Sequence, residues 1–233
     1  MEALFVESLV NYLSSRINRL TGSCEEFHQR SFPGGNDCVI SLFTPVQPAI
    51  ILGSTQDRSL INEQACLVNG VEIVKRRSGG GIVFLAQDST IWIDVEIPRE
   101  HSLWLNDVGE SSLWLGEVFE KELAELAHIN LALHRGSMIK TTWSSLICFA
   151  GRGPGEVFTQ DGRKVVGISQ RRTRDWARFQ CAISLQWKPE LLLNLLNEPR
   201  PTISDIENCG SNLSLDSAPV ATKLIDAIHL ALN

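Results

Sequence analysis

The spacing of hydrophobic and polar residues predicts a helix at the start of the chain and short strands after it. Residues 2–20 place apolar side chains three and four positions apart, which is the period of an amphipathic helix. Residues 21–37 are polar and contain Pro-Gly-Gly-Asn at 33–36, a composition typical of a loop. Two apolar runs follow, at 38–43 and 49–52, and each has the length of a strand.

The next part of the chain alternates between helix and strand patterns. Residues 60–69 have the pattern of a short helix, and 71–75 that of a strand leading into three glycines. In residues 90–97 apolar side chains fill every second position, which predicts a strand with one buried face and one polar face. Pro98 is expected to end this strand, since proline cannot donate a hydrogen bond to a neighbouring strand.

Three later segments have helical periodicity. The clearest is 111–127, whose apolar positions form one stripe and whose start Ser111 or Ser112 can cap. Residues 189–196 begin with a proline, which is favoured in the first turn of a helix. Residues 219–232 place aliphatic side chains on one face and predict a helix near the C-terminus.

Strand patterns and a glycine-rich connection lie between the first two of these helices. Residues 163–169 and 178–185 predict two strands, which would form a hairpin around 170–177. Residues 151–162 contain four glycines and a proline, and we expect a mobile loop there. Because strands and helices alternate irregularly, the elements predict an α+β sheet backed by helices rather than a doubly wound parallel fold.

Composition narrows the class of protein. The chain has 233 residues, 43% of them hydrophobic, which fits one domain spanning residues 1–233. A net charge of −6 argues against general nucleic-acid binding, which needs clustered basic residues. No apolar run reaches the roughly 18 residues that cross a bilayer, and the N-terminus lacks the basic start of a signal peptide. We therefore expect a cytoplasmic protein without a membrane partner.

One local stretch departs from the acidic average. A basic patch on an acidic protein favours a specific anionic partner, although a solvated charged surface has the same appearance. The stretch, opposed mainly by Asp175, contains Arg163, Lys164, Arg171, Arg172, Arg174 and Arg178.

The segment 75–84 joins paired arginines to three consecutive glycines. Glycines have no Cβ, so a ligand can lie directly against their backbone. An arginine can bind a phosphate or an acyl carbonyl, because the planar guanidinium donates several hydrogen bonds at once. Taken alone, the same pattern also fits a tight turn with two surface arginines. The residues in question are Arg76, Arg77, Ser78, Gly79, Gly80 and Gly81.

A lone lysine, Lys164, stands in a second segment with strand character. The segment, residues 162–172, reads Gly-Arg-Lys-Val-Val-Gly-Ile-Ser-Gln-Arg-Arg. An ammonium aimed at an acyl carbonyl stabilises the negative charge of a tetrahedral intermediate, and it can also favour a thiolate or bind a phosphate. On its own, the lysine could equally be an exposed strand residue.

Taken in order, the two segments resemble those of the superfamily of lipoate–protein ligases, octanoyltransferases and biotin–protein ligases. The resemblance covers about residues 40–185 and includes a Gly-x-x-Gln at 53–56. It implies a class II aminoacyl-tRNA synthetase/biotin synthetase-like α+β domain, with a mixed, mainly antiparallel sheet flanked by helices. It implies that Lys164 and the arginine–glycine loop hold an activated acyl group. It implies further substrate-binding positions at Gly167 and Ser169.

The chain departs from the family pattern just after the glycines. Family members usually have His-Asp there, whereas this chain has Leu85-Ala86, with Asp88 two residues later. Leu85 and Ala86 cannot supply the polar contacts that a His-Asp pair would make, and the replacement can change which acyl group or nucleotide fits there.

The role of Cys148 distinguishes a mechanism that uses a cysteine nucleophile from one that does not. It stands 16 residues before Lys164, and some cysteine-dependent octanoyltransferases of the family have a Cys-Phe at a similar distance; here Phe149 follows. A nearby ammonium lowers the pKa of a thiol and makes it a better nucleophile. The resemblance therefore implies that Cys148 and Lys164 are catalytic. The alternative is that Cys148 is a small buried hydrophobic residue.

The remaining cysteines and histidines give weaker indications. The six cysteines form no CxxC pair, so we expect free thiols and no metal site. Cys209 is a rival nucleophile, since Cys209-Gly210 resembles the Pro-Cys-Gly of lipoyl(octanoyl) transferases. Cys181 is expected in a strand core, and Gln180 is a polar group that can face the site. The histidines form no catalytic constellation and are expected at the surface or satisfied in the core: His28, His101, His128, His134 and His229.

Three functions remain open from the sequence. The first is an acyltransferase of the lipoylation pathway, which moves an octanoyl or lipoyl group from acyl-carrier protein through a Cys148 thioester to the lysine of a lipoyl domain, without a cofactor. The second is an ATP-dependent lipoate–protein ligase that uses free lipoate, ATP and Mg to make lipoyl-adenylate. Many ligases carry a C-terminal accessory domain, and the roughly 45 residues after Leu185 are too few for one. The third is a non-catalytic family member that binds a lipoyl or acyl group.

Overall fold

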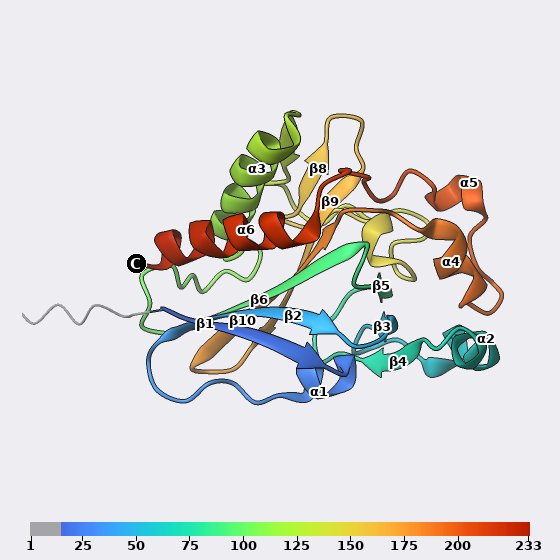
Figure 1. Ribbon diagram of the computed structural model, residues 1–233, viewed down its shortest axis with the longest axis horizontal. Coiled ribbons are helices and arrows are strands. Elements are labelled where there is room, and N and C mark those ends of the chain that lie inside the picture. Colours follow the sequence, from blue (N-terminus) through green and yellow to red (C-terminus); the bar gives the residue numbers. More distant parts are fainter. Residues whose placement is uncertain (1–14) are drawn as a thin grey trace, which may run out of the picture.

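The chain folds around two β-sheets, shown in a computed structural model that describes residues 15–233 (Figure 1). Within these residues the larger sheet has the strand order β1 (Ser15–Gly22), β2 (Cys38–Pro45), β6 (Thr90–Pro98), β10 (Trp176–Ser184), β9 (Lys164–Arg172), β8 (Val157–Thr159) and β7 (Leu131–Leu133). The smaller sheet has the order β4 (Glu72–Lys75), β3 (Ala49–Leu52) and β5 (Val83–Leu85).

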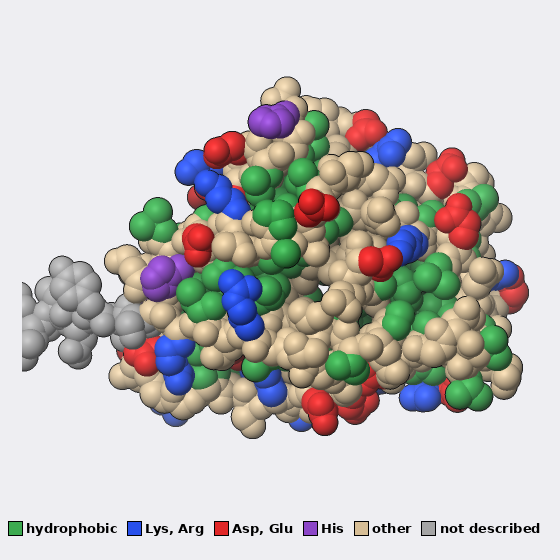
Figure 2. All heavy atoms as spheres, in the orientation of Figure 1, with side chains coloured by type: hydrophobic (Ala, Val, Ile, Leu, Met, Phe, Trp, Pro, Cys, Tyr) green, Lys and Arg blue, Asp and Glu red, His purple; other side chains and the backbone are tan. Residues whose placement is uncertain are grey.

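Most neighbouring strands are antiparallel. In the larger sheet only the β1–β2 pair is parallel among the described strands, and in the smaller sheet β3 is parallel to β4 and antiparallel to β5. The predicted α+β class with a mixed, mainly antiparallel sheet is confirmed. On the face shown in Figure 2, acidic and basic side chains are interspersed.

Helices cover the sheets on different sides. The helices are α1 (Cys24–Gln29), α2 (Glu63–Val68), α3 (Leu113–Ala127), α4 (Pro189–Asn194), α5 (Ile203–Ile206) and α6 (Ser217–Leu232), with 3-10 turns η1 (Arg58–Leu60) and η2 (Cys148–Ala150). The two long helices, α3 and α6, lie side by side on one face of the larger sheet (Figure 1). Phe119 of α3 and Leu224 of α6 are fully buried in the core that fills this interface. No helix in the described part of the chain is long and apolar enough to cross a bilayer.

The opposite face of the larger sheet packs against α1 and the smaller sheet. Phe27 of α1 stacks on Phe43 of β2 at 4.2 Å and meets the edge of Trp92 of β6 at 4.7 Å. Ile51 of β3 and Leu85 of β5 belong to the same apolar cluster. Residues of this second core line the first of the two cavities described below.

The structure of strand β6 differs from the prediction that one of its faces is polar and exposed to solvent. Asp94 and Glu96, expected to face solvent, are 0% and 2% exposed. They are buried because two guanidinium groups neutralise them: Arg30 lies 2.8 Å from Asp94, and Arg178 lies 2.5 Å from Glu96. Alternating polarity therefore reflects a buried ion-pair cluster under this strand rather than contact with water.

The N-terminal region corrects two further predictions. Residues 15–20 belong to the strand β1 and not to a helix. The remainder of the predicted helix 2–20, which is residues 2–14, lies outside the described residues. The expected loop at 21–37 contains α1, which starts where the Ser23 hydroxyl accepts a hydrogen bond from the Glu26 amide at 3.1 Å. This helix forms because it buries Phe27 and His28 against the sheet.

Most other predicted elements are confirmed. The strands expected at 38–43, 49–52, 71–75, 90–97, 163–169 and 178–185 and the helices at 60–69, 111–127, 189–196 and 219–232 all have counterparts. The cap of α3 differs, because Ser112 makes no capping bond and instead donates to the Pro154 carbonyl at 3.0 Å. The glycine-rich segment 151–162, expected to be only a loop, contains β8.

Candidate active site

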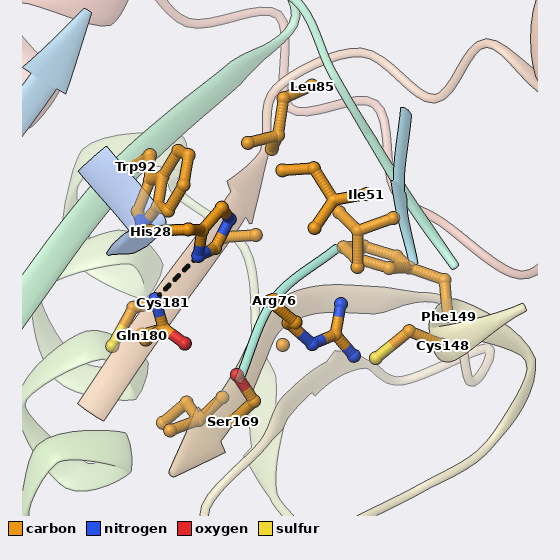
Figure 3. A pocket seen from close by; sticks show the side chains of 14 residues that line it. His28, Ile51, Arg76, Leu85, Trp92, Cys148, Phe149, Ser169, Gln180 and Cys181 are labelled. Atoms are coloured by element: carbon orange, nitrogen blue, oxygen red, sulfur yellow. Dashed lines mark hydrogen bonds between the residues drawn. The ribbon is translucent and has the colours of Figure 1, made fainter. Parts of the chain in front are cut away.

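Two cavities are both lined by Cys148, Ile168 and Ser169, and the first of them lies between the two sheets. We call the first the apolar cavity; its empty space, including open solvent at the mouth, is about 410 Å³. We call the second the glycine-lined cavity; its empty space, measured in the same way, is larger, at about 1440 Å³. The apolar cavity is lined mainly by Ile51, Val83, Leu85, Trp92, Phe149 and Ala182 (Figure 3). The glycine-lined cavity includes Gly79, Gly80, Gly81, Glu156 and Lys164.

Arg76 supports the glycine loop from inside the protein. Its guanidinium is 4% exposed and donates to the carbonyl of Gly79 at 2.8 Å and to that of Gly81 at 2.9 Å. The side chain also points toward the sulfur of Cys148 (Figure 3). Burial lowers the pKa of Arg76, and the interaction with the Cys148 thiol opposes this shift.

Arg77 does not share this environment. Its side chain is exposed and donates to Gln29 at 3.0 Å, and it lines neither cavity. The two arginines thus point in different directions, as successive residues in an extended segment do. Of the pair predicted to contact substrate, only Arg76 faces the site.

The glycines allow the loop to lie against the segment that carries Cys148. Gly81 has the tightest fit, because a Cβ there would lie 2.6 Å from the Cys148 amide nitrogen and 2.7 Å from the Ile147 carbonyl carbon. The Ile82 amide donates to Leu146, and the Cys148 amide donates back to Ile82 at 3.0 Å. The loop therefore fixes the backbone of Cys148.

We predict that Gly81→Ala reduces activity strongly, because the new methyl group must push the Cys148 backbone away from the cavities. A displacement of about 1 Å costs on the order of 100-fold in rate. The matched control is Gly34→Ala, where a Cβ meets no atom within 4 Å and which lines neither cavity, so activity should change little. Steady-state kinetics of the two variants are the measurement, and equal losses in both would contradict the prediction.

Lys164 is buried beside a carboxylate that the sequence did not indicate. It begins β9, is 1% exposed, and its Nζ lies 2.7 Å from Oε2 of Glu156. The same ammonium donates to the Cys148 carbonyl at 2.8 Å. Backbone bonds from the Lys164 amide to Cys209 and from the Ser211 amide to Lys164 hold this end of the strand. The ammonium is thus fixed next to the nucleophile candidate and neutralised by Glu156.

A polar chain borders the apolar cavity on the side opposite Phe149. Ser78 donates to Gln180 at 3.0 Å and lies 3.1 Å from the hydroxyl of Ser169. The Gln180 amide in turn meets Nδ1 of His28 at 3.1 Å. This arrangement brings the predicted residues Ser78, Ser169 and Gln180 together, and Gly167 lines the same cavity.

In the folded protein, Cys181 and Cys209 differ from Cys148 in their surroundings, and the basic residues of 163–178 do not form one surface. Cys181 is fully buried in β10, and burial raises the pKa of its thiol well above the ordinary value. Burial also raises the pKa of Cys209, which lines neither cavity. The expected basic surface is divided, because Lys164 and Arg178 are each 1% exposed and paired with carboxylates. In residues 15–233 no group of three His, Cys, Asp or Glu side chains is arranged to hold a metal ion.

His28 was expected to be an ordinary surface or core histidine, and its surroundings are unusual. It is 4% exposed against Trp92 of β6, with ring centroids 4.4 Å apart. Burial, together with the neighbouring Arg76, Arg30 and Arg178, lowers its pKa to about 3. The imidazole is therefore neutral at physiological pH.

This pKa predicts an acid-sensitive stability. Between pH 6.5 and 3 the unfolded state binds a proton at this histidine and the folded state does not, so stability falls as the pH is lowered. At pH 5 the loss is on the order of 2 kcal/mol relative to pH 7. Urea unfolding at both pH values should show a smaller difference for His28→Phe than for the native protein. An unchanged pH dependence would contradict the prediction.

The family assignment agrees with this geometry. Residues 23–217 match the model of the lipoyl protein ligase A/B catalytic domain. The match covers most of the chain, and the protein belongs to this family. It is an enzyme of the lipoate–protein ligase and transferase type.

Solved structures of other proteins have the same fold as this chain. A crystal structure of lipoate-protein ligase A bound with ATP has a TM-score of 0.72 and 15% identity, and the match covers 94% of this chain and 85% of that one. A bi-partite lipoate protein ligase with its E2 lipoyl domain from Thermoplasma acidophilum has a TM-score of 0.69 and 12% identity, with 95% and 85% covered. The crystal structure of LipL1 from P. falciparum in complex with lipoate has a TM-score of 0.62 and 13% identity, and the match covers 92% of this chain and 61% of that one. A comparison with curated protein sequences gives no match.

Proposed function

We propose that the protein is a cysteine-dependent acyltransferase, which moves an octanoyl or lipoyl group onto the lysine of a lipoyl domain. The observation that carries the proposal is the position of Cys148. Its half-buried thiol lies where the two cavities meet, beside the buried guanidinium of Arg76 and within the turn that Lys164 binds. A thiol at the junction of two cavities can be reached both by an acyl donor and by an acceptor amine, as a covalent acyl-enzyme requires.

The first half of the reaction transfers the acyl group to the enzyme. The Cys148 thiol loses its proton and attacks the carbonyl carbon of an acyl-carrier thioester, the bond to the carrier sulfur breaks, and the carrier sulfur leaves as a thiol with the proton that Cys148 lost. The ammonium of Lys164 stabilises the charge that develops on the carbonyl oxygen. The apolar cavity takes the acyl chain, because its walls are almost entirely hydrocarbon.

The second half delivers the acyl group to the acceptor. The neutral amine of a lipoyl-domain lysine enters through the glycine-lined cavity and attacks the thioester. An amide bond forms, the bond to the Cys148 sulfur breaks, and the proton lost by the amine returns to the thiol. This sequence needs neither ATP nor a metal. Gly79, Gly80 and Gly81 line this cavity, and the carrier arm and then the acceptor lie against their backbone.

A ligase reaction is the second candidate, and the size of the glycine-lined cavity favours it. ATP would occupy this cavity, with Gly79, Gly80 and Gly81 against its phosphates. The fit to Mg²⁺ is poor, since the ion is usually bound by one or two carboxylates together with phosphates. Glu156 supplies the one carboxylate among the described lining residues, and it is already paired with Lys164. This residue set favours the transferase.

The test is the intact mass of a lipoyl domain after incubation with the protein and an octanoyl-carrier protein, without ATP. Addition of an octanoyl group supports the proposal. If the mass changes only with free lipoate, ATP and Mg²⁺, the protein is a ligase. If neither set of substrates changes the mass, the protein is a non-catalytic acyl- or lipoyl-binding member of the family.

A further inference from the structure

The apolar cavity contains one polar atom without a partner. Nε2 of His28 is buried and makes no hydrogen bond within the described residues. In Figure 3 this nitrogen points away from Gln180, toward the gap between Leu85 and Ile51. Both of those residues and His28 line the cavity. Buried polar groups in folded proteins almost always have partners, so an unpartnered one in a ligand cavity indicates a group supplied by the ligand.

The orientation of the Gln180 amide in the structure determines which nitrogen of His28 carries the proton. The Gln180 carbonyl oxygen accepts from Ser78, so the Gln180 amide nitrogen is the group that faces His28 and donates to Nδ1. A neutral imidazole has one donor and one acceptor nitrogen. With Nδ1 accepting, Nε2 carries the hydrogen and is a donor aimed into the cavity.

The charges around the ring favour an electron-rich partner. Arg76, Arg30 and Arg178 all raise the electrostatic potential at His28. Asp94 and Glu96 neutralise the last two, whereas Arg76 binds backbone carbonyls and the region near Cys148. A hydrogen-bond acceptor placed at Nε2 is stabilised by this field, and a hydrocarbon group there leaves the donor unsatisfied.

We propose that His28 is a specificity-determining residue, which selects an acyl chain bearing a hydrogen-bond acceptor near its far end over an unsubstituted alkyl chain. The acceptor is a ring sulfur, as in a 1,2-dithiolane, or an oxygen substituent. The proposal rests on the proposed function, since it takes the apolar cavity as the site of the acyl chain. His28 thereby supplies a polar group from α1 in a cavity where this chain has Leu85 in place of the usual histidine.

The test compares the binding of three free acids by calorimetry: octanoic, 8-hydroxyoctanoic and lipoic acid. The variant is His28→Phe, which keeps an aromatic ring against Trp92 and removes both nitrogens. The affinity of each substituted acid relative to octanoic acid should fall about 3- to 10-fold in the variant, the value of one neutral hydrogen bond. A fall for lipoic acid alone assigns the acceptor to sulfur, and a fall for the hydroxy acid alone assigns it to oxygen.

A buried histidine outside both cavities provides the control. His101→Phe likewise replaces a buried imidazole with an aromatic ring, and the relative affinities should stay within about 2-fold of the native values. Equal ratios in native protein and His28→Phe overturn the role of His28, even where the lipoyl domain is still acylated. Altered ratios without acylation support the role of His28 and refute the acyltransferase.

Discussion

Replacement of Cys148 by alanine should abolish acyl transfer to the lipoyl domain. The proposed reaction has no other route for the acyl group, and loss of a catalytic nucleophile costs roughly 10⁴-fold or more in kcat. The fold should survive, because the thiol is half-buried and its replacement removes one atom. Binding of free acyl acids should therefore persist. The measurement is the rate of acylation by mass spectrometry, with circular dichroism as the check on folding.

Cys209 offers a matched control. It is also a half-buried free thiol, and its carbonyl accepts a hydrogen bond from the Lys164 amide at 2.9 Å. Cys209→Ala should retain activity within about 3-fold, since this thiol lines neither cavity. In the absence of an acceptor, native protein should gain the mass of the acyl group at Cys148. Full activity in Cys148→Ala, or loss only in Cys209→Ala, would disprove the proposed nucleophile.

The sequence predicted those elements whose apolar pattern matches their surroundings. Helix α3 and strand β10 each bury one continuous apolar set, so their periodicity predicted them. The prediction failed at strand β1 because this is an exposed edge strand that is held by pairing with β2. Backbone pairing leaves no periodic signal in the side chains. Strand β6 failed on its polar face because the partners of Asp94 and Glu96 come from residues 30 and 178, far away in the sequence.

The site shows the same division between local and long-range information. The motifs indicated Lys164, the glycine loop and Cys148, and the structure brings these together. They did not indicate Glu156, although it stands eight residues before Lys164 and follows a Gly-Pro-Gly. His28 had no detectable signal, because its importance arises from contacts with β6 and β10 that only the folded chain creates. The motifs thus indicated the proposed reacting groups, whereas the ion pair of Lys164 with Glu156 and the surroundings of His28 depend on contacts that no motif records.

Removal of the Lys164 ammonium should lower both the stability and the activity of the protein, each for a different physical reason. Lys164→Met leaves the 4%-exposed Glu156 without its countercharge, with only the Gly153 amide as a donor at 2.6 Å. Loss of one member of a buried ion pair costs about 3–5 kcal/mol in the free energy of unfolding. Urea denaturation measures this loss. Acyl transfer should fall as well, because the positive charge that stabilises the tetrahedral intermediate is gone.

The double variant Lys164→Met/Glu156→Gln separates these two effects. Neutralising Glu156 removes the uncompensated buried charge, so most of the lost stability should return. Activity should not return, since the glutamine restores no cation near the acyl carbonyl. A folded double variant that remains inactive assigns an electrostatic role in catalysis to Lys164. A double variant that regains both stability and transfer would show that Lys164 only supports the fold, and that Arg76 alone supplies the positive charge beside Cys148.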